Sequence, residues 1–220
     1  MSKGASRTPA VKPDVDLRGQ WAFVRDQGSR GTCLACAASD CHDHAHKSGA
    51  LSAEFLFYHA VQAMPNKNPD DGITFGTARQ ALTSHGQPVE AEWPYQLTQP
   101  SPWMPPTVTK RWRGDLGLGL ADATAIAKLI KQGTPVIVGL QLTAGFVGSI
   151  AAPFVIPATG AGFGGHAVLG IGCGHLSGKE HLLIRNSWGV KWADQGHAWL
   201  PLQYLADKLI GYAVITKQGP

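Results

Sequence analysis

The sequence predicts an α+β fold made of two lobes, one helical and one mainly β. Its 220 residues suit one large domain or two small lobes at the usual ~150 residues per domain. Apolar residues recur at helical spacing in the first half of the chain. After residue 135 they form short runs bounded by Gly and Pro, which is typical of strands. We therefore expect a flexible tail over residues 1–13, a helical lobe over about 14–98 and a β lobe over about 99–220.

The tail and the first helix follow from composition and periodicity. Residues 1–13 are polar, lack periodicity and carry two prolines, so they predict a tail or a strap over the surface. Thr32 is placed to cap a helix that runs from Cys33 to about Lys47 and stops at Gly49. Its apolar stripe consists of Leu34, Ala38, Cys41 and Ala45. Cys33 then lies at the helix N-terminus, about 100° from the face that enters the core.

Two more helices complete the helical lobe. Ser52 caps an almost wholly apolar helix through about Ala63. The third helix ends at Gly86 and has the stripe Ala78, Ala81, Leu82 and His85. The segment 93–106 is rich in Pro and Trp, which favours an irregular connection between the lobes.

The C-terminal half is predicted to be mainly β. A short helix capped by Asp122 ends at Gly133 and precedes an apolar strand over 136–140. A Gly- and Pro-rich loop continues through Gly165. Three further strands are expected near residues 166–173, 181–186 and 196–200. The first two of these flank a polar turn and form a hairpin.

Composition and charge exclude several classes of function. The net charge is only +4 and basic residues do not form long clusters, which argues against a nucleic-acid partner. No apolar run approaches the ~20 residues that span a bilayer, and the first twelve residues hold no signal-peptide core. We expect no membrane partner and a cytoplasmic protein, with export as an effector by a route without a signal peptide as the alternative. The four cysteines are a poor layout for disulfides and predict free thiols.

A nucleophile and a base can be assembled from separate parts of the chain. Pairing the predicted hairpin about its midpoint places His166 opposite Asn186, close enough for the amide to fix the imidazole tautomer. Cys33 is the best-activated thiol, because the helix dipole and an imidazolium would lower its pKa from ~8.5 to ~7.5 or below. Gln27, across a Gly-rich turn, can direct an amide to the same point.

These residues lie in three short sequence blocks. The blocks are Gln27 to Cys33 (QGSRGTC), Gly165 to Val168 (GHAV) and Arg185 to Gly189 (RNSWG). They resemble, in the same order, the signature blocks of the papain-like cysteine peptidases. Other segments resemble the short, bacterial-type branch of that family, namely LSAE at 51–54, Asp71-Gly72, Trp93-Pro94-Tyr95 and WLP at 199–201. The similarity covers about residues 14–216.

The resemblance implies a fold and a set of roles. The fold would be papain-like, with a helical N-terminal lobe, an antiparallel β-barrel-like C-terminal lobe and the active-site cleft between them. Cys33 matches the nucleophile, His166 the general base that becomes general acid, and Asn186 the residue that orients the histidine. Gln27 matches the side chain that forms the oxyanion hole with the backbone N–H of Cys33. Trp188 matches the aromatic ring that shields the His–Asn bond from water.

Substrate contacts are implied as well. Gly72 lies near the glycine whose backbone pairs with an extended substrate. The pocket for the side chain next but one to the cleaved bond would be lined near Gly139, Gly164 and Gly165, which predicts a roomy apolar pocket. The insertion from Gly145 to Gly165 is a candidate to cap one end of the cleft, which would favour exopeptidase behaviour.

The chain departs from the family pattern at four positions. Arg30 stands where many secreted members carry a disulfide-bonded cysteine, and we interpret it as a solvated turn residue rather than as a group that raises the thiolate population. Leu34 replaces an aromatic residue. Lys191 and Ala193 occupy positions that are usually glycine, so the leaving-group side of the cleft is expected to differ.

Other interpretations use the same residues. A zinc-binding module would use Cys33, Cys36, Cys41, His42, His44 and His46, but on one continuous helix these side chains point in different directions. A thioredoxin-like role for Cys33 and Cys36 lacks the usual βαβ context. Cys36 is therefore interpreted as a packing residue, like Cys41 and Cys173, with redox protection as the lesser alternative. A papain-like acyltransferase or amidase, or a non-catalytic binding scaffold, would share the fold.

The favoured function is that of a thiol-dependent peptidase, an endopeptidase, which needs no metal or cofactor. It would act on a peptide or protein substrate through an acyl-enzyme on Cys33. Zymogens of the family carry a long inhibitory segment, whereas about a dozen residues precede the region of similarity here, which begins near residue 14. We therefore expect restraint by narrow specificity, by an inhibitory or immunity partner, or by export.

Overall fold

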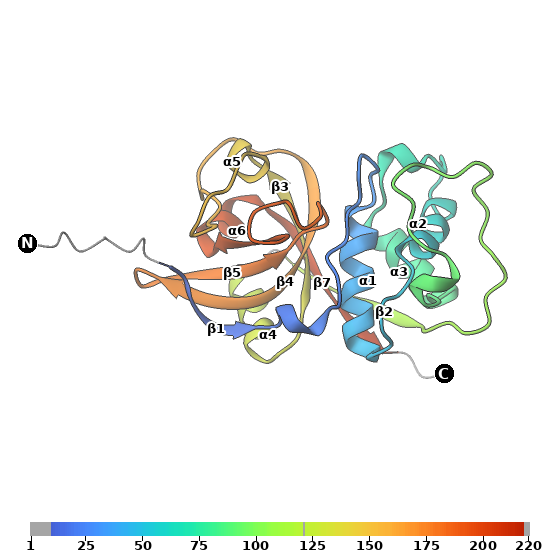
Figure 1. Ribbon diagram of the computed structural model, residues 1–220, viewed down its shortest axis with the longest axis horizontal. Coiled ribbons are helices and arrows are strands. Elements are labelled where there is room, and N and C mark those ends of the chain that lie inside the picture. Colours follow the sequence, from blue (N-terminus) through green and yellow to red (C-terminus); the bar gives the residue numbers. More distant parts are fainter. Residues whose placement is uncertain (1–9, 121, 218–220) are drawn as a thin grey trace, which may run out of the picture.

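The helix α1 (Cys33–His46) stands between the two lobes. The structure is a computed structural model that describes residues 10–120 and 122–217. Figure 1 shows an antiparallel sheet on one side of α1, and the helices α2 (Ala53–Gln62) and α3 (Phe75–Ser84) on the other. The predicted α+β fold, with one helical and one β lobe, is confirmed.

The four predicted helices are present, and two of the three predicted caps form. Ser52 Oγ accepts a hydrogen bond of 3.1 Å from Phe55 N at the start of α2, and Asp122 caps α4 in the same manner. Thr32 precedes α1 without a side-chain capping bond, because its hydroxyl pairs with that of Tyr95 at 2.6 Å. Helix α4 spans Ala123–Lys131, and the α-helices α5 (Ala144–Val147) and α6 (Leu202–Lys208) are additional to the predicted ones. Within the described residues, the helices are too short or too polar for a membrane span.

Seven strands of the described chain form one antiparallel sheet. Four lie where apolar runs predict them: β3 (Val136–Leu142), β4 (Phe163–Leu176), β5 (Lys179–Arg185) and β6 (His197–Pro201). Three are additional: β1 (Lys12–Asp16), β2 (Gly114–Gly119) and β7 (Leu209–Lys217). The order is β2-β7-β3-β4-β5-β6, with β1 paired to β4. The sheet therefore ends at β2 and β6 and does not close into the expected barrel-like form.

The lobe boundaries differ from those predicted. Lys12 and Pro13 pair with β4, so the C-terminal end of the predicted tail over 1–13 is part of the sheet. Residues 1–9 lie outside the described chain. Trp103, assigned by sequence to the β lobe, belongs to the helical lobe, because its Nε1 donates to Glu54 of α2 at 2.7 Å. Backbone pairing and side-chain contacts across the chain, which composition does not reveal, decide these boundaries.

The two faces of the sheet are covered by different helices. Ile137 and Leu169 pack with buried side chains of α1, α2 and α3 in one core cluster. Val138 packs on the other face with Ile130 of α4 and Tyr204 of α6. This division follows from the pleat, because neighbouring residues of a strand point to opposite faces.

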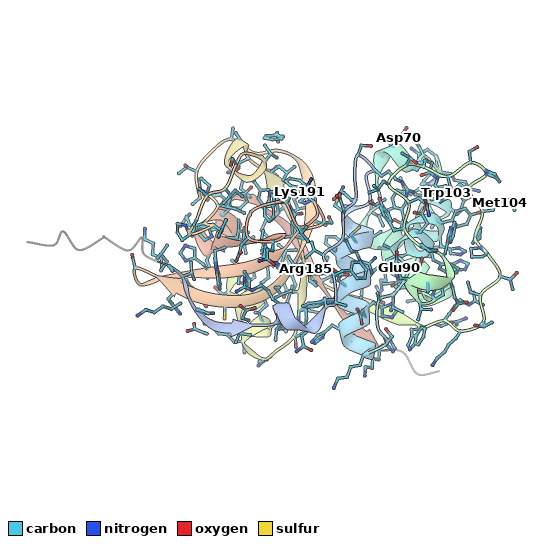
Figure 2. All side chains as sticks on the ribbon, in the orientation of Figure 1. Asp70, Glu90, Trp103, Met104, Arg185 and Lys191 are labelled. Carbon is cyan, nitrogen blue, oxygen red and sulfur yellow. The ribbon has the colours of Figure 1, made fainter. Side chains whose placement is uncertain are left out.

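A buried ionic network holds α1 in place between the lobes. Asp40 of α1 accepts hydrogen bonds from Arg25 Nε at 2.6 Å and from Arg185 Nε at 2.7 Å. Arg25 also reaches Glu90 Oε2 at 2.9 Å. Figure 2 shows Arg185 and Glu90 on the two sides of α1. Since Asn186 directly follows Arg185, the network also sets its position relative to α1.

Candidate active site

The loop before α1 is tied to the β lobe. Gln27 N donates to Ser187 O at 2.8 Å, and Asp26 and Trp188 form an isolated antiparallel bridge. Gly28 turns the loop with a φ of 58°, a left-handed conformation that favours glycine. The first and third sequence blocks therefore lie side by side, although 160 residues separate Gln27 from Ser187.

Cys33 is the first residue of α1 and is half-buried. Its thiol lies against the backbone N–H of Ala167, the residue that follows His166. Burial raises the pKa of this thiol, while the N–H groups of Ala167, Leu34 and Cys33 itself act in the opposite direction. The predicted lowering of the Cys33 pKa is thus not seen, because burial outweighs the helix N-terminus.

His166 lies on β4 and is buried. Its Nε2 and Asn186 Oδ1 are 2.7 Å apart, and Asn186 Oδ1 also accepts from Ser187 N at 2.9 Å. With Nε2–H donating to the amide, Nδ1 carries the lone pair and is the basic nitrogen. Burial lowers the pKa of His166 to about 4, against the opposing effect of the Asn186 bond. Burial therefore disfavours the charged forms of both the Cys33 thiol and the His166 imidazole.

The strand register that brings His166 to Asn186 differs from the predicted one. His166 pairs with Leu140 of β3, and Leu169 pairs with Arg185, the last residue of β5. A register shift between Gly170 and Gly172 separates the Leu169–Arg185 pair from the part of the hairpin near the turn. The predicted cross-strand pairing is wrong, but the predicted side-chain bond forms, because Asn186 continues past the end of β5.

Aromatic rings surround the His166–Asn186 bond. Trp188 lies over the imidazole with ring centroids 4.8 Å apart. Phe146 of α5, which is fully buried, packs edge-on against His166 at 5.9 Å and against Trp188 at 5.6 Å. The structure thus places Trp188 where the resemblance implied. Phe146 adds a second apolar wall that the sequence did not indicate.

Both ends of the Gln27 amide are held. Its Oε1 accepts from Ser187 Oγ at 2.7 Å, and its Nε2 donates to Arg30 O at 2.8 Å. The amide nitrogen has two protons, so one stays available for a further acceptor. Ser187 is a positioning residue that sequence reasoning missed, although it lies inside the third block.

Gly72 lies beside the loop that carries Cys33. A Cβ atom on Gly72 would lie 3.1 Å from Gly31 O, and the φ of Gly72 is 71°. Both the close contact and the left-handed backbone require glycine here. The backbone of Gly72 therefore lies beside the first block.

The three glycines expected to line the substrate pocket have different surroundings. Gly139 on β3 is covered by Phe75, the first residue of α3, because a Cβ atom on Gly139 would lie 3.1 Å from Phe75 Cε2. A Cβ atom on Gly165 would lie 3.7 Å from Ile210. Gly164 is exposed, with open space around it. Phe75 thus fills part of the space that the three glycines leave.

The insertion 145–165 is anchored to the β lobe. Phe146 and Ile156 are fully buried in the core cluster on the α4 and α6 side of the sheet. Ile156 N donates to Trp199 O at 2.9 Å. These anchors give the insertion a packing role that sequence did not predict.

Arg30 is not the solvated turn residue that we expected. Its Nη1 and Nη2 lie 2.6 and 2.8 Å from the two carboxylate oxygens of Glu54, whose side chain is fully buried. Nη1 also donates to Gln96 O at 2.7 Å, and the guanidinium lies 5.1 Å from the centre of the Tyr95 ring. Arg30 therefore ties the loop to α2 and to the segment 93–106.

The cysteine and histidine side chains of α1 diverge. Cys41 Sγ contacts Pro135 O at 3.6 Å, whereas His42 Nδ1 bonds Gln87 Oε1 at 2.7 Å. His44 packs on Trp21, and His46 Nε2 bonds Arg113 O at 2.9 Å. In the part of the chain that the structure describes, these residues do not gather into a metal-binding cluster. The geometry contradicts the zinc alternative.

Most of the chain matches one known protein family. Residues 11–205 match the family described as papain family cysteine protease. The chain is 23% identical over 196 residues to digestive cysteine proteinase 2 of Homarus americanus, covering 86% of this chain and 60% of that protein. It is 26% identical over 190 residues to cathepsin L1 of Drosophila melanogaster, covering 83% and 51%. The chain thus spans 60% or less of the length of these two relatives.

Solved structures show the same fold. Xylellain, a cysteine protease from Xylella fastidiosa, superposes with a TM-score of 0.80 at 24% identity, covering 96% of this chain and 91% of that one. A cysteine protease of Carica candamarcensis, solved in complex with E-64, superposes with a TM-score of 0.66 at 21% identity, covering 96% and 100%. At these identities the likeness establishes the fold alone.

Proposed function

This chain belongs to the papain family of cysteine proteases, and we propose that it is a thiol-dependent endopeptidase that cleaves through an acyl-enzyme on Cys33. The observation that carries the proposal is that the two lobes bring the Cys33 thiol and the His166–Asn186 pair together. The helical lobe supplies Cys33, whose thiol lies against Ala167 N–H. The β lobe supplies His166, which Asn186 holds at 2.7 Å.

The first half of the reaction forms the acyl-enzyme. His166 Nδ1 takes the thiol proton as Cys33 Sγ attacks the carbonyl carbon of the substrate. The carbonyl oxygen becomes negative. It accepts one hydrogen bond from the second N–H of Gln27 Nε2 and one from Cys33 N–H. The His166 imidazolium then gives its proton to the leaving amine, the C–N bond breaks and a thioester remains on Cys33.

The second half returns the enzyme to its resting state. His166 Nδ1 removes a proton from water, which attacks the thioester carbonyl. The same donors stabilise the second oxyanion, the C–S bond breaks and the carboxylic acid product leaves. Cys33 recovers its proton from His166. Trp188 and Phe146 favour this cycle because an apolar cover strengthens the His166–Asn186 bond.

The surroundings of the site support an extended peptide or protein substrate. The backbone of Gly72 lies next to the Gly31 carbonyl and is free of a side chain that would block a paired strand. Phe75 and the exposed Ile210 supply apolar surface beside Gly139 and Gly165. We propose a preference for a medium-sized apolar side chain next but one to the cleaved bond. Restraint by an inhibitory or immunity partner remains part of the proposal.

Labelling of Cys33 tests the proposed nucleophile. The reduced protein is exposed to a peptidyl epoxide and measured by intact-mass spectrometry. One adduct is expected on the wild type, none on Cys33→Ala and slower addition on His166→Ala. Cys173→Ala, which alters a buried thiol of β4, is the matched control and should label like the wild type.

Product analysis tests the reaction. Incubation with an internally quenched peptide should release a free carboxylic acid and a free amine at one internal bond. Products extended by an added amine would identify an acyltransferase instead. A folded protein that takes up no epoxide and cleaves no peptide would be a binding scaffold, and the proposed function would be wrong.

A further inference from the structure

Two of the four cysteines share the first turn of α1. Cys33 is its first residue, and Cys36 lies three residues later. In an α-helix this spacing puts the two Cα atoms about 5 Å apart, inside the ~4.4–6.8 Å range of disulfides. The mechanism above uses Cys33 and gives Cys36 no role.

The Cys36 thiol is directed toward the end of the helix at which Cys33 lies. Cys36 is buried, and its Sγ lies 4.0 Å from Thr32 Oγ1, one turn back. It also borders a small cavity that Ala167 and Asn186 line. Cys36 is therefore close to the catalytic residues.

The other two cysteines are poor partners. Cys41 Sγ contacts Pro135 O at 3.6 Å and lies in the core between α1 and the sheet. Cys173 belongs to the core cluster on the opposite face of the sheet. Cys33 and Cys36 are thus the pair that the fold brings together.

We propose that Cys33 and Cys36 form a reversible disulfide under mild oxidation by peroxide, which switches the enzyme off and protects its nucleophile. The inference rests on the proposed function, because a disulfide at Cys33 regulates the enzyme only if Cys33 is its nucleophile. Burial raises the pKa of Cys36 to about 12, with the charge of Arg25 opposing this. Oxidation therefore starts at Cys33, which is half-buried, whereas Cys36 is buried.

The chemistry balances with one peroxide molecule. His166 holds the Cys33 proton while the thiolate attacks hydrogen peroxide, so an S–O bond forms, the O–O bond breaks and one water leaves. The Cys36 sulfur then attacks the sulfenic sulfur. The S–S bond forms, the S–O bond breaks and the oxygen leaves as a second water. Two electrons pass from the thiols to the peroxide, and an external dithiol returns them.

A disulfide between Cys33 and Cys36, in the first turn of α1, should be easily reduced. Cβ atoms three residues apart in a helix are ~5–6 Å apart, whereas a disulfide needs ~3.5–4.5 Å, so the first turn must tighten. The first N–H groups of a helix have no partners within it, which leaves this turn free to adjust. Strained disulfides have higher reduction potentials, so a dithiol should restore the enzyme.

Thiol counting by mass spectrometry tests the proposal. The reduced full chain, which has four free thiols, is treated with hydrogen peroxide, denatured and alkylated. We expect a loss of about 2 Da and a fall from four alkylated cysteines to two. Dithiothreitol should restore four and also restore peptidase activity. Cys36→Ala should show no such loss of mass and should gain oxygen at Cys33, with permanent loss of activity.

One further variant shows which two cysteines form the disulfide. The tryptic peptide 31–47 holds Cys33, Cys36 and Cys41, so its mass alone does not say which two are joined. Cys41→Ala should still lose two alkylation sites. Equal oxygen uptake at Cys33 in the wild type and in Cys36→Ala, without a disulfide, would overturn the inference.

Epoxide labelling of the untreated reduced proteins separates the two proposals. Labelled Cys33 in the wild type and in Cys36→Ala shows that the variant is folded and that the nucleophile is active. In that case the absence of a disulfide refutes the switch alone. A disulfide that forms in a protein whose Cys33 resists the epoxide and which cleaves no peptide refutes the peptidase instead.

Discussion

Ser187 Oγ lies 2.7 Å from Gln27 Oε1 and holds the amide that we propose faces the reacting carbonyl. The same residue donates its backbone N–H to Asn186 Oδ1 at 2.9 Å. Ser187 thus connects Asn186, which bonds His166, with Gln27, the proposed oxyanion donor. Both bonds are buried, so each is strong relative to one exposed to water.

Loss of the Ser187 hydroxyl should slow the chemical step. In Ser187→Ala the Gln27 amide loses one of its two anchors, and its remaining proton is less well aimed. Complete loss of an oxyanion donor costs about 10²–10³ in kcat, so we expect a fall of about 10-fold with little change in KM. Steady-state kinetics on a peptide substrate measure this.

A double variant separates positioning from general damage. Gln27→Ala should lower kcat by about 10²-fold or more, and adding Ser187→Ala should cost little beyond that, because both changes remove the same donor. Ser187→Thr, which keeps the hydroxyl, should retain more activity than Ser187→Ala. Fully additive losses would contradict a positioning role.

The Arg30–Glu54 pair should be essential for stability. Arg30→Met leaves the fully buried Glu54 carboxylate without its cation, which typically costs about 3–5 kcal/mol. The double variant Arg30→Met/Glu54→Gln removes the buried charge and keeps an acceptor for Trp103 Nε1, so it should recover part of the loss. Urea unfolding measures the free energies.

An exposed pair provides the matched control. Arg79 and Asp115 are also 2.6 Å apart, but the Arg79 side chain is 52% exposed. Arg79→Met should cost much less stability than Arg30→Met, because water screens an exposed ion pair. Similar losses at both sites would show that burial of Glu54 does not matter.

Acid should destabilise the fold below pH ~6.5, the usual pKa of histidine. Burial lowers the pKa of His42 to about 4, and burial together with the charge of Arg185 does the same for His197. Between pH ~6.5 and ~4 the unfolded chain binds protons at these residues that the folded chain does not bind. The free energy of unfolding is therefore highest above about pH 6.5 and falls by about 1.4 kcal/mol per pH unit for each such histidine.

Unfolding in urea at a series of pH values tests this. The wild type should lose stability steadily between about pH 6.5 and 4. His42→Gln, which keeps a polar partner for Gln87, should show a shallower slope over the same range. A slope that is unchanged in this variant would contradict the assignment to His42.

Phe75 should control which side chain the substrate pocket accepts. In Phe75→Ala the ring no longer covers Gly139, so a larger substrate side chain can enter. We expect kcat/KM to shift by roughly 10-fold toward aromatic side chains next but one to the cleaved bond, as a few buried methylene groups would give. A peptide library profile measures the shift, and an unchanged profile would place the pocket elsewhere.

The candidate catalytic groups could be placed on their elements from the sequence because each is tied to a local pattern. A Gly-rich turn followed by a helix start places Cys33 at the N-terminus of α1, and capping residues set the limits of α2 and α4. Alternation and apolar runs located the strands β3 to β6. Such signals depend on neighbours within a few residues, so sequence carries them directly.

The strand β2 lacked such a signal. The sequence of β2, GDLGLG, is rich in glycine and has low strand propensity. It becomes a strand because it pairs with β7, where Leu116 faces Ile215. Pairing between segments about a hundred residues apart overrides local preference, and the pairing register of His166 was missed for the same reason.

By itself, the sequence determined the residue types, their order and the local elements that carry them: a thiol at a helix start, an imidazole on a strand and an amide beyond the next strand. Only the tertiary structure decided the state and surroundings of these groups. Burial, which many distant residues create together, raises the pKa of Cys33 and lowers that of His166. It also makes Arg30 the partner of Glu54 instead of a solvated turn residue. Desolvation depends on everything that packs around a group, so a local pattern cannot encode it.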